Sequence, residues 1–180
     1  MSAPSPSRAT PPVSRREVPL VIGCGNDHRR DDGCGRAAAR SLRPLLGGRA
    51  RLVESDGEAT NLLDLWDEQD LVIVVDAVRS GRAPGTVQRI EVGEGPLPAS
   101  VSTGSTHGFS LAEGVALGRS LGRFPNRLVI YGIEAGDLEM GAGLTPAVAE
   151  AVENVVARID REIPGSGGAP NRPTEAAPHA

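Results

Sequence analysis

Short apolar runs alternate along this chain with segments of helical periodicity, and this alternation limits the fold more than any other feature. The clearest run is Leu71-Val-Ile-Val-Val75, which is β-branched after its first residue and typical of a buried strand. Similar short runs predict strands at 18–22, 51–55 and 127–131. Helical spacing of apolar residues predicts helices over 31–46 and 59–66, and after Ser110 and Pro146. Strands that alternate with helices predict an α/β fold with a mostly parallel sheet and helices on both faces.

One further strand differs from the others because its apolar and polar residues alternate strictly. It runs from Thr86 to Val92, and we place it at an edge of the sheet, with one face exposed to solvent. The whole pattern fits a single domain over residues 17–164. Residues 1–16 and 165–180 are dominated by Pro, Ser, Ala and Gly, with almost no large apolar side chains, and are predicted to be disordered tails.

Charge and hydropathy argue against two classes of partner. The formal net charge is −4, and the arginines, which supply every basic residue, are dispersed along the sequence, so no nucleic-acid partner is expected. No apolar run approaches the roughly 18 residues of a membrane span, and residues 1–16 lack the apolar stretch of a signal peptide. We therefore expect a cytoplasmic protein, in which Cys24 and Cys34 are simply packed, without a disulfide.

Acidic side chains follow the ends of the predicted strands. Asp31 and Asp32 come after the first strand, Asp56 after the second, Asp76 after the third, and Glu134 near the end of the last. In open α/β sheets, ligands bind beyond the carboxyl ends of the strands, so these acids are predicted to share one rim.

Each of these acids also has a structural interpretation. One of Asp31 and Asp32 is expected to cap the first helix, but capping does not account for both. Asp56, followed by glycine, taken alone predicts an ordinary turn. Asp76 is expected to bond backbone N–H groups, and Glu134 fits a solvated strand end.

His107 is predicted to lie on the same rim, just before a helix, although a surface-loop histidine fits as well. Two carboxylates and a neutral imidazole form a plausible three-ligand metal site with open positions. Such a set suits a borderline divalent ion such as Zn, Ni, Mn or Fe and does not choose among them. The other histidines, His28 and His179, are expected to be exposed.

Three other chemistries have weaker support. A dinucleotide-binding fingerprint would need a third glycine where His28 stands. A nucleophile elbow has the motif G-x-S-x-G. Around Ser105 the glycine that follows the serine stands at position 108, one position too late for this motif. A carboxylate pair that shares one proton would need Asp32 and Asp56 in contact, which the sequence does not indicate.

Five segments, in order, resemble the motifs of the hydrogenase maturation protease family. The first, VIGCGNDHRRDDGCG at 21–35, resembles the family's opening strand, its G-x-G-N turn and the acidic pair before glycine. The others are ESDG at 54–57, VDAV at 75–78 with Pro84-Gly85, STHGFSL at 105–111 and YGIE at 131–134. The resemblance covers residues 18–160, roughly the whole predicted domain.

The resemblance implies a three-layer αβα sandwich around a five-stranded, mostly parallel sheet, which allows one antiparallel edge strand. It assigns Asp32, Asp56 and His107 as the metal-contacting and catalytic residues. Some family members have Glu where this chain has Asp32, whose shorter side chain is compatible with metal binding in an altered geometry.

The resemblance also implies a substrate and a partner. Family members act as monomers and cut a short C-terminal peptide from the precursor of a nickel-iron hydrogenase large subunit after nickel insertion. The nickel would then come from the precursor. Other readings stay open: a germination-protease-like peptidase of the same fold, a non-catalytic nickel-sensing chaperone of the precursor, and, with least support, a nucleotide-binding protein.

Overall fold

The computed structural model describes residues 18–67, 69–93, 95, 97 and 111–164. These residues form a single α/β unit, in which the predicted alternation of strands and helices is confirmed. The two predicted tails, the segment with His107, and Ser110, after which a helix is predicted, lie outside the described residues.

The described strands form one five-stranded sheet in the order β2-β1-β3-β5-β4. Their bounds are β1 Leu20–Cys24, β2 Arg51–Ser55, β3 Leu71–Val78, β4 Val87–Glu91 and β5 Arg127–Glu134. The pairs β1–β2, β1–β3 and β3–β5 are parallel, and β4 runs antiparallel to β5. The strand with strict alternation is thus the antiparallel edge strand, and the apolar, β-branched β3 lies at the centre.

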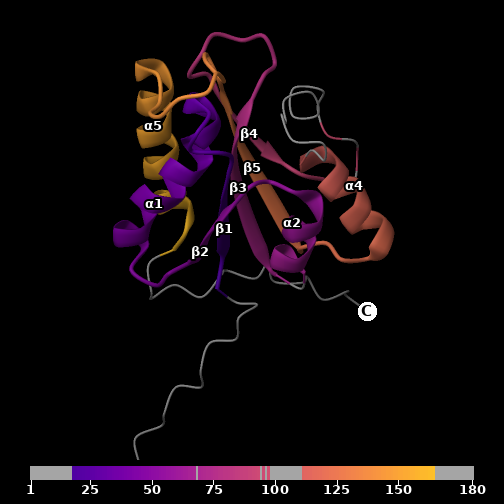
Figure 1. The fold of residues 1–180 in the computed structure, drawn as a ribbon. Helices are drawn as coiled ribbons and strands as arrows, with labels where there is room; N and C mark the ends of the chain where they lie inside the picture. The colour runs from indigo at the N-terminus through magenta and orange to yellow at the C-terminus, as the bar shows by residue number, and fades with distance from the viewer. Residues whose placement is uncertain (1–17, 68, 94, 96, 98–110, 165–180) are drawn as a thin grey trace, which may run out of the picture.

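Helices cover both faces of this sheet, as Figure 1 shows. Their bounds are η1 Arg30–Gly33 (a 3-10 turn), α1 Cys34–Leu46, α2 Ala59–Trp66, α4 Leu111–Leu121 and α5 Pro146–Glu162. Helices α1 and α5 pack on one face, and α2 and α4 on the other. The expected three-layer sandwich is therefore confirmed.

The core divides into two clusters because successive side chains of a strand point to opposite faces. In β3, Ile73 packs towards α1 and α5, whereas Val72 and Val74 pack towards α2 and α4. All three side chains are fully buried, and most other large buried side chains are aliphatic. Burial on both faces explains why β3 has a continuous apolar sequence instead of an alternating one.

Candidate active site

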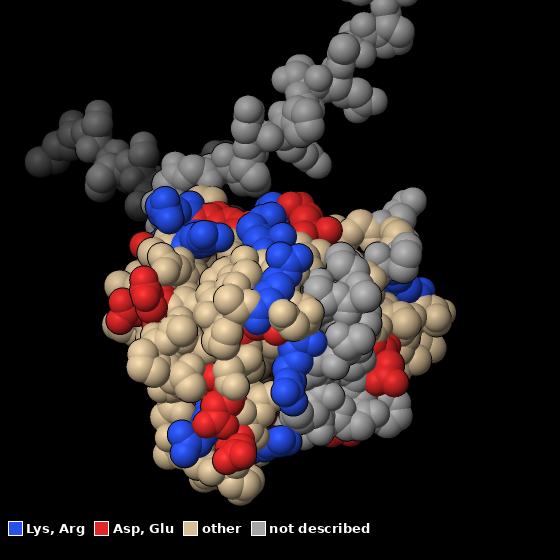
Figure 2. Space-filling view, turned by 90° about the horizontal axis from the view of Figure 1, so that it is seen from above, with Lys and Arg blue, Asp and Glu red and all other residues tan. Residues whose placement is uncertain are grey.

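The carboxyl ends of the parallel strands meet at one end of the molecule, the upper end in Figure 1. Asp56 directly follows β2, Asp76 lies in the last part of β3, and Asp32 lies in η1, which follows β1. Figure 2 looks down on this end and shows arginine side chains running across it, with a few acidic side chains between them. The three acids therefore lie at the carboxyl ends of the strands, as the order of predicted strands indicated. We call this expectation the strand-end rule.

Two glycines of the opening motif allow η1 and α1 to sit directly on the strand ends. Gly25 has φ +124°, and a Cβ there would lie 1.8 Å from the backbone oxygen of Asp32. A Cβ on Gly35 would lie 2.2 Å from the oxygen of Val75 and 2.4 Å from that of Cys24. Glycine is thus required at positions 25 and 35 because the backbone packs too closely there for a side chain. This close packing brings Asp32 against the ends of β1 and β3.

Asp32 and Asp76 form the buried part of the site. Asp32 is 5% exposed, and its Oδ2 accepts a hydrogen bond from the backbone N–H of Asn26 at 3.1 Å. Asp76 is partly buried and accepts a hydrogen bond from the N–H of Ala77 at 2.9 Å, as its structural interpretation predicted. Burial and then the charge of Asp32 raise the pKa of Asp76 to about 7.

Asp56 is exposed and lies two residues before Glu58, the N-cap residue of α2. Its Oδ1 accepts hydrogen bonds from the N–H of Glu58 at 3.1 Å and from the side chain of Asn61 at 3.3 Å. These hydrogen bonds, of which the one from Glu58 has the largest effect, hold the pKa of Asp56 below its usual range. The group is therefore a carboxylate near neutral pH. Gly57 has φ +84°, which confirms the predicted turn. An open groove of about 440 Å³ between β2 and α2 includes Asp56 in its wall.

The register of the strands fixes how the site acids are spaced. Ser55 pairs with Cys24, and Val75 pairs with Gly23, so Asp56, just after β2, and Asp76, in the last part of β3, lie on either side of β1. Strands lie about 4.8 Å apart, which separates the two backbone positions by roughly 10 Å. The buried Cys24 thiol lies between them, and burial, followed by the charges of Asp76 and Asp56, raises its pKa.

A third metal-binding side chain would have to come from His107, which lies outside the described residues. Within the part of the chain that the structure describes, no three His, Cys, Asp or Glu side chains are grouped closely enough to hold a metal ion. The assignment of Asp32, Asp56 and His107 as metal-contacting and catalytic residues stays a prediction.

Asp31 does not cap the first helix, and the prediction that one acid of the pair does so is wrong. The N-cap position of α1 is Gly33, and no side chain bonds the helix end there. Asp31 is fully buried and instead accepts four hydrogen bonds from the loop before α5, two from Thr145 and one each from the N–H groups of Gly136 and Asp137. These bonds are 2.7–3.0 Å long and attach that loop to η1.

Glu134 is not a solvated strand end either. It is 3% exposed, and its carboxylate accepts hydrogen bonds from the N–H groups of Ser80 and Gly81 and from the Ser80 hydroxyl. Sequence reasoning missed this role because the partners belong to another strand connection. The only available signal was the position of Glu134 at the end of an otherwise apolar strand.

The remaining predictions about single residues are confirmed where the structure describes them. Cys24, at the end of β1, and Cys34, at the start of α1, are both buried and form no disulfide with each other. His28 is exposed. None of the helices among residues 18–67 and 111–164 has the length and apolar character needed to cross a membrane.

The family model described as "Hydrogenase maturation protease" matches residues 47–162, which is more than half of the chain. The chain belongs to this family. The matched range includes Asp56 and His107, whereas Asp32 lies before it. The resemblance drawn from five short motifs is therefore confirmed at the level of the family.

Curated members of the family align over most of this chain. The hydrogenase expression/formation protein HupD of Thiocapsa roseopersicina is 30% identical over 136 residues, which cover 74% of this chain and 62% of that protein. This alignment therefore spans less than two thirds of the relative's own length. The hydrogenase 2 maturation protease of Escherichia coli is 28% identical over 151 residues, which cover 82% of this chain and 92% of that protein.

A solved structure supports the same relationship. The hydrogenase maturating endopeptidase HybD from E. coli superimposes with a TM-score of 0.61 at 28% sequence identity. The superposition covers 78% of this chain and 88% of that one. The α/β fold with one antiparallel pair is thus the fold of this family.

Proposed function

We propose that this protein is an endopeptidase that removes the C-terminal peptide of a nickel-iron hydrogenase large-subunit precursor after nickel has been inserted. The proposal is supported by membership of the hydrogenase maturation protease family and by relatives named as a maturation protease and a maturating endopeptidase. The partner is the precursor itself, and the protease works in the cytoplasm as a monomer.

The observation that carries the proposal is the position of two acids on one open rim. Asp32 and Asp56 come from the connections that follow two adjacent parallel strands, and Asp56 opens directly onto a surface groove. A rim of this kind is where α/β proteins bind their ligands. Carboxylate oxygens, together with the imidazole of His107, are suitable donors for a borderline divalent ion such as nickel.

In the proposed mechanism, nickel belongs to the substrate. Asp32, Asp56 and His107 contact the nickel of the precursor and so hold the scissile bond against the rim, which is mainly a proximity effect. One of the two carboxylates, directly or through a water molecule that it holds, then acts as the general base: it takes a proton from the water that attacks the peptide carbonyl, and the leaving amine takes up a proton as the C–N bond breaks.

The test is a mass measurement on two forms of the precursor. The purified protein is incubated in parallel with nickel-loaded and nickel-free large-subunit precursor from the same organism. We expect the loaded form alone to lose one discrete C-terminal peptide.

Each other outcome changes the proposal in a defined way. Cleavage of both forms would keep the protease and remove the nickel requirement, as in a germination-protease-like peptidase. If neither form is cut but the two proteins associate, the protein is a non-catalytic chaperone and the proposed activity is wrong.

A further inference from the structure

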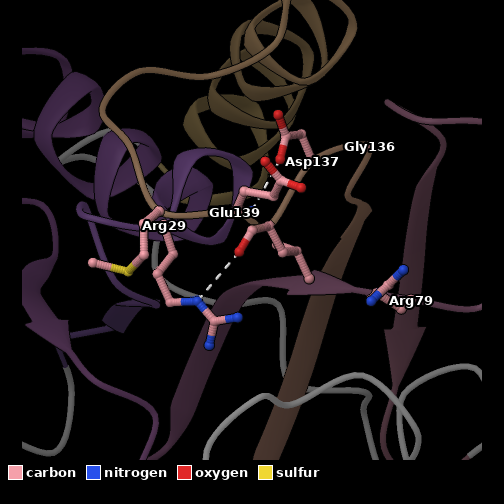
Figure 3. A pocket seen from close by; sticks show the side chains of 7 residues that line it. Arg29, Arg79, Gly136, Asp137 and Glu139 are labelled. Carbon is pink, nitrogen blue, oxygen red and sulfur yellow. Dashed lines mark hydrogen bonds between the residues drawn. The ribbon is translucent and has the colours of Figure 1, made fainter.

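A second pocket lies on the same end of the molecule, beside the candidate active site and outside the groove at Asp56. It has a volume of about 1110 Å³ and is lined by Arg29, Arg79 and the segment 136–140 (Figure 3). Ligand pockets typically measure roughly 300–1,000 Å³, so this one has room for a segment of peptide. We call it the rim pocket.

Two buried carboxylates hold the walls of the rim pocket in place. Asp31 bonds the N–H groups of Gly136 and Asp137, which form one wall. Glu134 bonds the N–H groups of Ser80 and Gly81, which directly follow Arg79. Because both walls are tied to fully or almost fully buried groups, the pocket is formed before any ligand arrives, which lowers the entropy cost of binding.

Arg29 and Asp137, which both line the rim pocket, have different partners. The Arg29 guanidinium donates through Nε to the carbonyl oxygen of Leu138 at 3.3 Å, and it forms no ion pair with any residue of the described ranges. Asp137, by contrast, is paired with Arg30 at 3.3 Å. In Figure 3 the carboxylates of Asp137 and Glu139 point away from the guanidinium groups of Arg29 and Arg79.

The rim pocket is also joined to the candidate active site by the chain itself. Arg29 stands three residues before Asp32, and the N–H of Asp32 donates to the carbonyl oxygen of Arg29 at 3.0 Å. Arg79 stands three residues after Asp76. The connections that carry Asp32 and Asp76 therefore also supply the two arginines of the rim pocket.

We propose that the rim pocket binds a carboxylate of the precursor's C-terminal extension, with Arg29 as its principal partner and Arg79 as a second cation. This inference rests on the proposed function and names the chemical group that the protease recognises beyond the scissile bond. The guanidinium fork suits a carboxylate because it can donate two parallel hydrogen bonds. The carboxylate is either the chain terminus or an acidic side chain of the extension.

The test is the binding of a synthetic peptide, because binding can be measured apart from cleavage. The peptide has the sequence of the C-terminal extension of the large subunit encoded in the same genome and carries a fluorophore for anisotropy. It is made with a free C-terminus, with an amidated C-terminus, and with each acidic residue replaced by its amide.

The variants remove one charge each. Arg29→Gln and Arg79→Gln change the pocket, and Arg158→Gln removes an exposed arginine of α5 outside it. We expect Arg29→Gln to weaken binding of the free acid by about tenfold or more, and Arg158→Gln to leave it unchanged. Arg29→Lys should fall between wild type and Arg29→Gln because it keeps the charge but loses the fork.

The peptides identify which carboxylate is bound. If amidation of the terminus weakens binding to the wild type, and Arg29→Gln then binds this peptide with the same affinity as the wild type, the terminus is the ligand. If replacement of one acidic residue by its amide has these two effects, that side chain is the ligand. Circular dichroism and thermal unfolding establish whether each variant is folded. If Arg29→Gln does not fold, Arg79→Gln tests the same pocket.

Failure of this inference can be told apart from failure of the proposed function. Equal affinity of the wild type and both pocket variants for every peptide would overturn the rim-pocket assignment even if the wild type cleaves the precursor. So would cleavage of the precursor without any binding of the peptide. Arginine-dependent binding without cleavage would keep the pocket and reject the protease.

Discussion

At the scale of single residues, the rim acids Asp31 and Glu134 hold loops, whereas Asp56 is open to solvent. Asp31 and Glu134 are buried, and their oxygens are occupied by donors from other segments. Asp56 is exposed, and its bonds to Glu58 and Asn61 both use Oδ1. Exposure together with a lowered pKa makes Asp56 the rim acid best suited to meet a cation.

Replacement of Asp56 by Asn tests its proposed role while keeping an acceptor for Glu58 and Asn61. Asn keeps an Oδ1 acceptor for Glu58 and Asn61 but lacks the negative charge. We expect precursor processing to slow by at least about 100-fold, with little change in stability. The assay is the same mass measurement on nickel-loaded precursor.

The matched control is Asp64→Asn, because Asp64 lines the same groove but is 78% exposed and paired with Arg123. It should process precursor at the wild-type rate. An Asp56→Asn protein as fast as wild type would show that Asp56 has no part in the reaction.

Replacement of Asp31 tests its role as an anchor. Asp31→Ala removes the acceptor of four part-buried hydrogen bonds, and we expect the free energy of unfolding to fall by about 3 kcal/mol or more. Thr145→Val removes only the hydroxyl donor and should cost about 1 kcal/mol. Urea unfolding followed by circular dichroism measures both, and equal losses in the two variants would contradict the anchoring role.

At the scale of elements, the first helix is placed by contacts that only glycine permits. Gly35 in the first turn of α1 lies against the backbone of both β1 and β3, so the helix start touches the two strands without side chains between them. The position of η1, and with it Asp32, depends on this close approach.

Gly35→Ala should therefore move or destabilise the start of α1. The added Cβ meets backbone oxygens, which cannot turn aside as side chains do, and we expect a loss of about 3 kcal/mol in stability. Gly114→Ala in α4 is the control, because its nearest neighbour would be the Trp66 side chain at 3.4 Å. That change should be neutral or stabilise the protein by up to about 1 kcal/mol through helix propensity. Thermal unfolding compares the two, and a Gly35→Ala protein as stable as its control would disprove the packing argument.

At the scale of the whole molecule, a polar cluster joins the last helix to the antiparallel pair of strands. Glu162 of α5 bonds Arg89 of β4 and the Tyr131 hydroxyl of β5, the latter at 2.8 Å, and Arg127 of β5 lies 3.5 Å from it. Burial raises the pKa of Glu162, but the bonds from Arg89 and Tyr131 outweigh it, and the net pKa is below the ordinary value of 4.5.

This lowered pKa makes part of the stability dependent on pH. A carboxyl whose pKa is lower in the folded state stabilises the fold above its unfolded pKa, and that contribution is lost as the pH falls through the folded pKa. We expect the free energy of unfolding of the wild type to exceed that of Glu162→Gln by about 1 kcal/mol at pH 7, because the partners are partly exposed. The difference should shrink once the pH falls below the ordinary value of 4.5 and vanish below the folded-state pKa. Urea unfolding at a series of pH values measures it, and a difference that is constant from pH 7 to pH 3 would contradict the assignment.

The sequence by itself determined the α/β class, the approximate position of each described strand and α-helix, and the rim on which the acids lie. Strand and helix periodicities are local properties, and the strand-end rule needs only the order of elements, so Asp32, Asp56 and Asp76 could be placed without coordinates. The motifs also identified the family. The predicted roles of Asp32, Asp56 and His107 still await experiment.

Only the tertiary structure decided what each polar group contacts. Asp31 and Asp32 are adjacent and alike in sequence, yet Asp31 bonds Thr145, 114 residues away, while Asp32 bonds the nearby Asn26. Glu134 likewise finds Ser80, 54 residues earlier. The physical reason is that a buried carboxylate takes its partners from whichever backbone the packing brings close, and no local pattern records that choice.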